Sequence, residues 1–166
     1  PKAAVVWGDG TIQMFAKNPS WASTDGYRDS LTEAGGGYDL TLRHQTVLHF
    51  GPVFPTTKII RHYRLESITE PGGSVINYQY DGLNRLVSVN DPDGRSIFIS
   101  YSSTKLMSAI FSAPGGYFRS YTFTSDVLNR LIRVDLPPVT TVSGPQNYDI
   151  EFSYDAGGNI ASVTDQ

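Results

Sequence analysis

A short motif recurs along this sequence at a nearly constant spacing, and this constrains the fold more than any other feature. Proline stands at Pro71, Pro92, Pro114 and Pro137, with spacings of 21, 22 and 23 residues. Most of these prolines close a short apolar stretch and are followed by glycine. Self-similarity at a fixed period is the sequence sign of a repeat architecture. The chain is therefore expected to build one small structural unit several times.

One complete copy shows what that unit is. Val75 to Tyr80 alternates in the manner of a strand, and residues 82–84 then reverse the chain, with Asn tolerating a positive φ. Arg85 to Asn90 reads as a second strand. Asp91 to Gly94, Asp-Pro-Asp-Gly, is a second turn, and Ser96 to Tyr101 begins the next strand. Each unit thus holds two strands and two reversals, which predicts an all-β antiparallel meander that curls as it grows.

The rest of the chain is expected to follow the same class. No segment has a helical period with caps. Two stretches are read as irregular: a long loop over 19–36 and an insertion over 137–147. We divide the chain into leading strands and a loop at 1–58, and about five repeats at 59–166, the last one truncated. The leading strands are expected at 3–7, 11–15, 38–43 and 46–50.

Composition excludes several classes of protein. The net charge is −3, so the basic surface of a nucleic-acid-binding protein is not expected. Cysteine is absent, which excludes disulfides, thiolate metal sites and a cysteine nucleophile. No apolar run reaches the ~20 residues of a membrane span. The start lacks the pattern of a signal peptide and begins with Pro, so we interpret the chain as a piece of something longer.

The copies resemble the YD repeat of bacterial Rhs proteins, toxin-complex shell proteins and teneurins. In that family Tyr-Asp is followed by a Gly or Asn, Arg-Leu, a Val and Pro-x-Gly. The matching residues are Tyr80, Asp81, Asn84, Arg85, Leu86, Val89, Pro92 and Gly94 in one copy; Asp126, Asn129, Arg130 and Leu131 in another; and Tyr154, Asp155, Gly158 and Ile160 in the last. Ser125 stands where Tyr is usual, Asn159 stands in the Arg place, and the copy around Tyr101 has lost its Asp.

The resemblance implies a structural function without enzymatic activity. In the family the repeats form a spiral β-sheet that closes into a shell around a C-terminal toxin domain. The implied partners are neighbouring repeats of a larger parent chain and an enclosed toxin or effector domain. The implied location is secreted or at the surface of a bacterial cell. The self-cleaving core segment that ends such shells has no match in this sequence.

The repeated polar residues are expected to be structural, because they recur with the repeat. The Asp is expected to accept backbone N–H groups of the turn that follows it. The Tyr is expected to pack across strands, and the Arg to lie over an aromatic ring or to pair with the Asp. No nucleophile, phosphate-loop or zinc-protease motif occurs, so no catalytic residue and no cofactor is predicted.

Metal binding is not predicted either. His44 and His49 are five residues apart, which would put them on opposite faces of one strand, and His62 has no partner in sequence. Asp91 and Asp93 suggest part of a calcium loop, but the other ligands are missing and Arg95 adds a cation. We interpret Asp91 to Gly94 as a plain turn.

An alternative function is a cell-surface adhesin fragment that binds carbohydrate or protein. Exposed rings on a β-surface can stack on sugars, and the candidates for glycan stacking are Trp7, Trp21, Tyr117 and Phe118. A cluster of two or three solvent-facing rings around a groove would favour this alternative over a packing role.

Two further expectations concern burial and the ends of the sheet. Leu86, Leu131 and Ile160 are expected to be buried at equivalent positions. The first strand, 3–7, and the last, 159–164, are expected to be open edges through which the chain self-associates.

Overall fold

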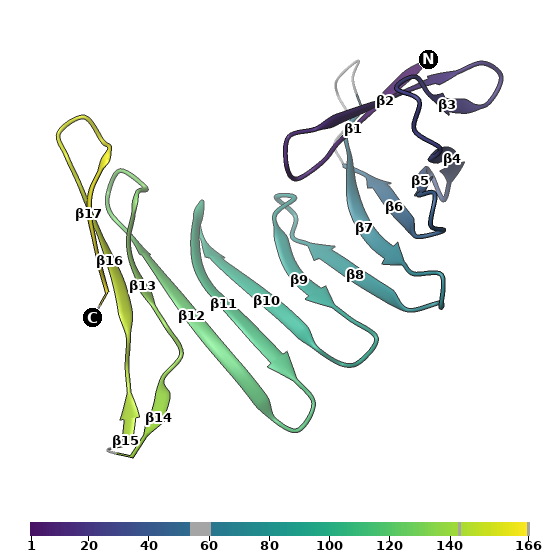
Figure 1. Cartoon of the computed structure of the whole chain (residues 1–166). Coiled ribbons are helices and arrows are strands. Elements are labelled where there is room, and N and C mark those ends of the chain that lie inside the picture. Colours follow the sequence, from purple (N-terminus) through teal and green to yellow (C-terminus); the bar gives the residue numbers. More distant parts are fainter. Residues whose placement is uncertain (54–60, 143, 166) are drawn as a thin grey trace. The chain divides into compact units, whose positions relative to one another are not determined.

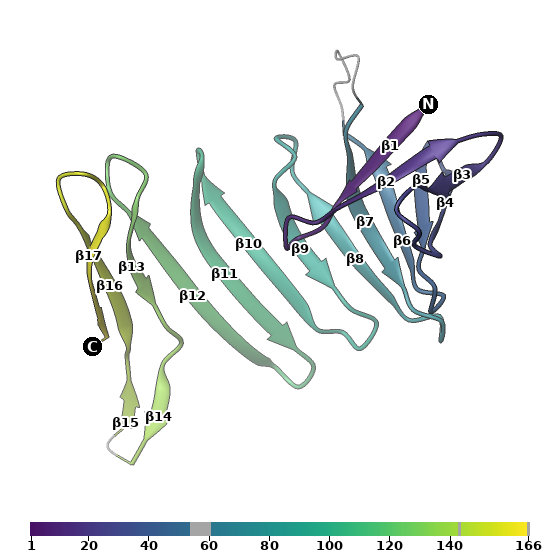
Figure 2. The same cartoon turned by 45° about the horizontal axis from the view of Figure 1, so that its top comes forward.

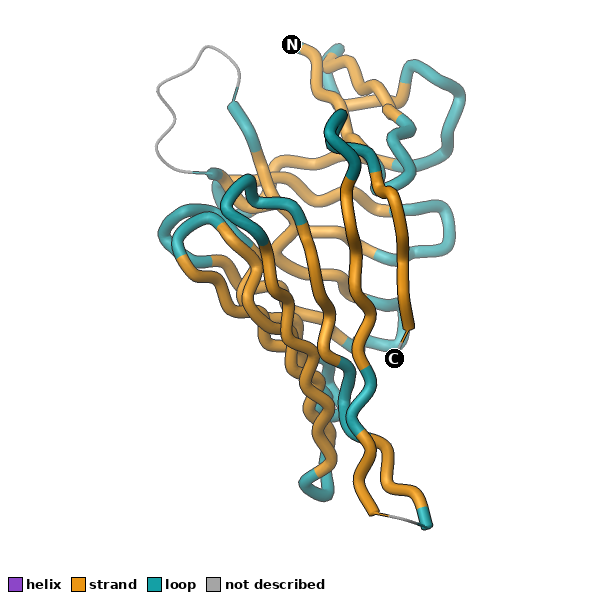
Figure 3. Tube along the Cα trace, turned by 90° about the vertical axis from the view of Figure 1, so that its left-hand side faces the viewer, coloured by secondary structure: helices purple, strands orange, loops and turns teal. Residues whose placement is uncertain are grey.

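The chain is built entirely from strands and turns in the part that the structure describes. The computed structural model describes residues 1–53, 61–142 and 144–165. No helix occurs in these ranges (Figure 3), which confirms the predicted all-β class of consecutive antiparallel hairpins. It follows that no described segment is a helix long and apolar enough to cross a membrane.

The chain divides into two compact units, Pro1–Asn84 and Arg85–Gln166, called unit 1 and unit 2 below. This division falls inside the first complete repeat, whereas motif content predicts a boundary at 58/59. Unit 1 contains β1 (Lys2–Val6), β2 (Ile12–Lys17), β3 (Trp21–Ser23), β4 (Ser30–Ala34), β5 (Gly37–Thr41), β6 (Val47–Pro52), β7 (Tyr63–Thr69) and β8 (Val75–Tyr80). Unit 2 contains β9 (Leu86–Asn90), β10 (Ser96–Ser102), β11 (Lys105–Ala113), β12 (Tyr117–Ser125), β13 (Leu131–Asp135), β14 (Val139–Thr141), β15 (Gly144–Gln146), β16 (Asp149–Tyr154) and β17 (Ile160–Asp165).

Unit 1 has two layers and a packed core. The small sheet β1-β2-β3 lies against one face of the antiparallel strands β4 to β7 (Figure 2). Leu31, Leu40 and Leu48 stand side by side across β4, β5 and β6 and are buried under Phe15 of β2, which is fully buried. Alternation along each strand places these residues on the covered face. All the fully buried hydrophobic side chains of the described chain belong to this cluster.

Unit 2 is a single antiparallel layer. Its strands follow the order β9-β10-β11-β12-β13-β16-β17, and consecutive strands lie side by side (Figure 1). The β14–β15 hairpin extends the connection between β13 and β16. One face is rich in hydroxyl groups, with Ser100 facing Ser108 and Ser153 facing Ser162 at Oγ–Oγ distances of 2.7 Å. The same face also carries the exposed Phe98, whereas Ile99 lies on the opposite face.

The single layer explains why one burial prediction is wrong. Leu86 and Leu131 are only half-buried, and Ile160 is 58% exposed. Within the described residues of unit 2 no second layer covers the sheet, so the repeated apolar position cannot be buried as it would be in a stacked core. The repeat is therefore tied together by contacts between neighbouring strands.

Two segments that the sequence predicts to be irregular contain strands in the structure. The stretch 19–36 holds β3 and β4, and the stretch 137–147 holds β14 and β15. β4 forms because pairing with β5 places Leu31 opposite Leu40 in the core of unit 1. Tertiary packing here outweighs the weak strand propensity of Ser-Leu-Thr-Glu-Ala.

The open edges of the described sheets include the two that were expected. β1 pairs only with β2, and β17 pairs only with β16. β4 is a further edge, since it pairs with β5 on one side of its sheet. The β1 strand has the sequence Lys-Ala-Ala-Val-Val, so its one charged side chain, Lys2, is its first residue.

Candidate functional site

A contact between tyrosine, arginine and a leucine carbonyl joins neighbouring strands of the repeat. The Tyr101 hydroxyl on β10 donates a hydrogen bond of 2.9 Å to the carbonyl oxygen of Leu86 on β9. The guanidinium of Arg85 lies 4.4 Å from the centroid of the Tyr101 ring. The Arg-Leu dipeptide thus contacts Tyr101 twice. The Arg85 side chain lies over the ring, and the Leu86 carbonyl accepts the hydrogen bond from the hydroxyl.

The same contact occurs in three places, each within one unit. The Tyr80 hydroxyl donates a 2.6 Å hydrogen bond to the Leu65 carbonyl. The Arg64 guanidinium lies 4.4 Å from the centroid of the Tyr80 ring. The corresponding contact between β13 and β16 has a 2.6 Å hydrogen bond from Tyr154 to the Leu131 carbonyl and Arg130 at 4.5 Å. A cation over an aromatic ring contributes about 0.5–1 kcal/mol, and a hydrogen bond about 1 kcal/mol. The contact is thus a repeated side-chain tie between neighbouring strands, in addition to their backbone pairing.

A β-bulge accompanies the repeated apolar residue, and sequence reasoning missed it. The register shifts by one residue where Leu65, Leu106, Leu131 and Ile160 pair with the preceding strand. A bulge sharpens the local twist and bends its strand. The sequence contains a signal for this bulge. Between the turn and the alternating stretch there is one residue more than a regular hairpin needs.

The repeated aspartate organises the turn that follows it. Asp126 Oδ1 accepts hydrogen bonds from the backbone N–H groups of Leu128 at 2.8 Å and Arg130 at 2.9 Å. Its Oδ2 accepts from Arg130 Nε at 2.7 Å. Asp155 Oδ1 accepts from the Asn159 N–H at 2.9 Å, and the Asn159 side chain takes the place of the guanidinium. Both contacts expected of the repeated arginine, ring and carboxylate, thus occur together at Arg130.

The Asp-Pro-Asp-Gly turn is built in the same way as the Tyr-Asp turn. Asp91 Oδ1 accepts from the N–H groups of Asp93 at 3.0 Å and Arg95 at 2.9 Å. Its other oxygen bonds the Arg95 guanidinium, so Asp91 serves the turn as its hydrogen-bond acceptor. The fourth residue of each of these turns has a positive φ: the angle is 63° at Asn84, 79° at Gly94, 64° at Asn129 and 82° at Gly158.

These hydrogen bonds lower the pKa of the turn carboxylates. The Arg130 N–H is the main cause of the lowered pKa at Asp126; burial opposes it by raising the pKa, and the Arg130 guanidinium adds to the lowering. The Asn159 N–H has the same effect on the pKa of Asp155. At Tyr80, burial raises the pKa of the hydroxyl, and the charge of Arg64 opposes that rise. The carboxylates are therefore held in their charged form as hydrogen-bond acceptors, and the tyrosine as a neutral donor.

The family of the repeat follows from comparison with known proteins. Residues 64–96 match the family model described as RHS Repeat. Residues 64–96 carry an RHS repeat. The matched range includes two of the arginines that cover a tyrosine, Arg64 and Arg85, and the complete Asp-Pro-Asp-Gly turn. No curated protein sequence matches the chain.

Solved structures with a similar fold come from much longer chains. The structure titled "Crystal Structure of TcdB2-TccC3" is 18% identical, with a TM-score of 0.56, over 94% of this chain and 9% of that chain. "Crystal Structure of TcdB2-TccC3-TEV" is 15% identical, with a TM-score of 0.55, over 99% of this chain and 9% of that chain. This chain thus spans about a tenth of the length of the chains whose fold it resembles.

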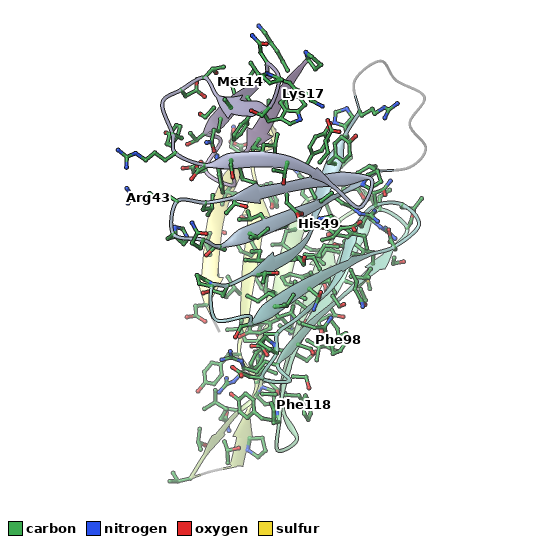
Figure 4. The ribbon with its side chains drawn as sticks, turned by 90° about the vertical axis from the view of Figure 1, so that its right-hand side faces the viewer. Met14, Lys17, Arg43, His49, Phe98 and Phe118 are labelled. Carbon is green, nitrogen blue, oxygen red and sulfur yellow. The ribbon has the colours of Figure 1, made fainter. Side chains whose placement is uncertain are left out.

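The aromatic residues considered for glycan stacking are dispersed. Trp7 and Trp21 pack at the margin of the unit 1 core, and Trp21 meets Tyr38 edge-on at 5.8 Å. Tyr117 and Phe118 are exposed, but they are consecutive in β12 and so point to opposite faces. Phe118 shares its face with Phe98 of β10 by strand register, and both rings are labelled in Figure 4.

The histidines do not form a metal centre in the described residues. His44 lies in the turn before β6 rather than on a strand, so the expected placement on opposite faces of one strand is wrong. His49 Nδ1 lies 2.6 Å from Asp39 Oδ1 on the neighbouring strand (His49 is labelled in Figure 4). No group of three or more His, Asp or Glu side chains in the described chain is placed to hold a metal ion.

Proposed function

We propose that the chain is a non-enzymatic structural segment of a larger RHS-repeat protein. The observation that carries the proposal is the use of the repeated polar side chains. Tyr, Arg and Asp of the motif bond to one another, to turn N–H groups and to a strand carbonyl. Residues engaged in this way hold strands in register and are not poised to act on a substrate.

We further propose that, in the parent protein, this sheet is part of a wall around a toxin or effector domain. The fold similarity to chains of which this one covers 9% supports a place among many further repeats. The open edges of β1 and β17 would then be covered by neighbouring repeats. Secretion, or display on the surface of a bacterial cell, belongs to the same proposal and is supported by the resemblance to toxin-complex proteins.

The test is to determine the full reading frame and to examine its product by electron cryo-microscopy. The proposal predicts a closed β-wall around an enclosed volume, with a downstream domain resistant to protease until the wall is opened. An open sheet next to sugar-binding modules or a membrane anchor would contradict it. That result would favour the adhesin alternative.

A further inference from the structure

A hollow at one end of unit 1 combines basic and aromatic side chains. It has a volume of about 480 Å³, and its lining includes Trp7, Tyr27, Arg28, Leu42, Arg43 and His44. A second hollow of about 450 Å³ shares Arg28, Leu42 and Arg43 with it. Both volumes lie in the range of small-molecule sites, about 300–1,000 Å³. The repeat motif contributes no residue to either.

The walls of the hollow are held in place by two carboxylates. Asp29 Oδ1 accepts a 2.9 Å hydrogen bond from the backbone N–H of Arg43, and its Oδ2 accepts one of 3.1 Å from the buried Gln13 amide. Asp25 Oδ2 accepts from the Met14 N–H at 2.7 Å. These bonds fix the loop after β3 to β2 and to the turn between β5 and β6. A site whose walls are already ordered loses less entropy when a ligand binds.

The lining of the hollow holds two arginines and one carboxylate. Among the residues that the structure describes, neither Arg28 nor Arg43 has a side-chain ion pair or hydrogen bond. Figure 4 labels Arg43, which lies on the turn between β5 and β6. His44 follows it on the same turn. Asp29 is the carboxylate in the lining, and its oxygens accept from a backbone N–H and a neutral amide, so its negative charge offsets one of the two arginines. Arg28 and Arg43 are both exposed, and together with Asp29 they leave one net positive charge at this recess of a chain whose net charge is −3.

The aromatic side chains supply flat apolar surfaces next to this charge. Trp7 lies at the base of the β1–β2 hairpin and is half-buried against the core, so its ring is fixed. Tyr27 is 55% exposed at the rim. Leu42 adds an apolar floor. A ligand that fits would have one apolar ring face and one negative group, and Arg recognises carboxylates in a bidentate way.

We propose that this recess binds an anionic sugar unit, namely a hexuronic acid or another carboxylated monosaccharide. The carboxylate pairs with Arg28 and Arg43, and the C–H face of the ring lies on Trp7 or Tyr27. This site goes beyond the structural function proposed above and does not depend on it. Trp7, one of the four rings considered for glycan stacking from sequence, lines this hollow together with Arg28 and Arg43.

The test uses the whole chain and D-glucuronate as the probe. Trp7 fluorescence is followed in a Trp21→Phe background, where Trp7 is the single tryptophan. Amide chemical shifts serve as a second readout. We expect saturable changes at Trp7, Arg28 and Arg43 with D-glucuronate, and at least tenfold weaker changes with D-glucose or the methyl ester of glucuronate. A sugar phosphate and inorganic phosphate are titrated in parallel. They separate a sugar site from a simple anion site.

Variants locate the site. Arg28→Gln and Arg43→Gln are each expected to weaken glucuronate binding about tenfold, the effect of losing a charged hydrogen bond. Arg61→Gln removes the same charge from an exposed position of unit 1 that does not line the hollow, and it should bind like the unmodified chain. The proposal is overturned if glucuronate and glucose bind alike, if phosphate alone binds as well as glucuronate, or if the Arg61 variant loses binding equally.

Discussion

The Tyr101 hydroxyl donates its hydrogen bond to the carbonyl of Leu86, the residue that follows the arginine lying over the same tyrosine ring. This relationship recurs at Tyr80 and Tyr154. It pairs the Tyr of one strand with the Arg-Leu dipeptide of the neighbouring strand. It therefore explains why the Tyr and the Arg-Leu recur at the same period. The following predictions test its parts.

Tyr101→Phe keeps the ring under Arg85 and removes the hydrogen bond to Leu86. We expect the free energy of unfolding, measured in urea, to fall by about 1 kcal/mol. Tyr148→Phe is the matched control, because its hydroxyl has no hydrogen-bond partner among the described residues, and it should change stability little. Equal losses in the two variants would show that the Leu86 carbonyl is well solvated without its partner.

A double-mutant cycle on Arg85 and Tyr101 measures the cation–ring contact itself. The variants are Arg85→Gln, Tyr101→Leu and the pair, each followed by denaturant unfolding. We expect a coupling energy of about 0.5–1 kcal/mol, because the guanidinium lies 4.4 Å from the ring centroid at a partly exposed site. If the effects of the two single changes are strictly additive, the contact between Arg85 and Tyr101 does not stabilise the sheet.

The fourth position of the turn requires a positive φ, which is 64° at Asn129. Asn129→Gly should therefore be close to neutral, since glycine occupies the same position at Gly94 and Gly158. Asn129→Ala should lower the free energy of unfolding by about 1–2 kcal/mol, the cost of a left-handed conformation for a residue with a Cβ. A tolerated Ala would mean that the turn can change its type at little cost.

The lowered pKa of Asp126 makes its contribution to stability depend on pH. Because the pKa is lower in the folded chain than in the unfolded one, the contribution is complete above the unfolded value of about 4 and is lost as the pH falls through the folded value. Asp126→Asn should thus be less stable than the unmodified chain at pH 7, and the difference should shrink at pH 3. A difference that stays constant between these two pH values would contradict a role for the charge.

The sequence predicted the class of fold and the turns well because both depend on local chemistry. Asp126, Asn129 and Arg130 carry the turn through bonds within five residues, so the motif alone indicates the geometry. The strand ties at Tyr80 and Tyr154 were foreseen only in part. Their partners lie 15 and 23 residues back, and register decides which carbonyl is reached.

Burial was predicted poorly because it depends on what covers a face. Ile160 matches the repeat position but is 58% exposed, since a single-layer sheet leaves that position open. Leu31 belongs to no motif, yet it is buried because β4 pairs with β5 under the β1–β3 sheet. The recess at Arg28 and Arg43 was equally invisible, because its walls come from three separate turns.

Light scattering tests most directly the central claim that this chain is a segment of a longer sheet. The edges of β1 and β17 should pair with other copies, so the mass should rise above 18.2 kDa with concentration. The double variant Ala4→Lys and Val163→Lys places charge on both exposed edge strands and should restore the monomer. A strict monomer at every concentration up to about 1 mM, with the β17 amides protected from hydrogen exchange on both sides, would contradict the claim.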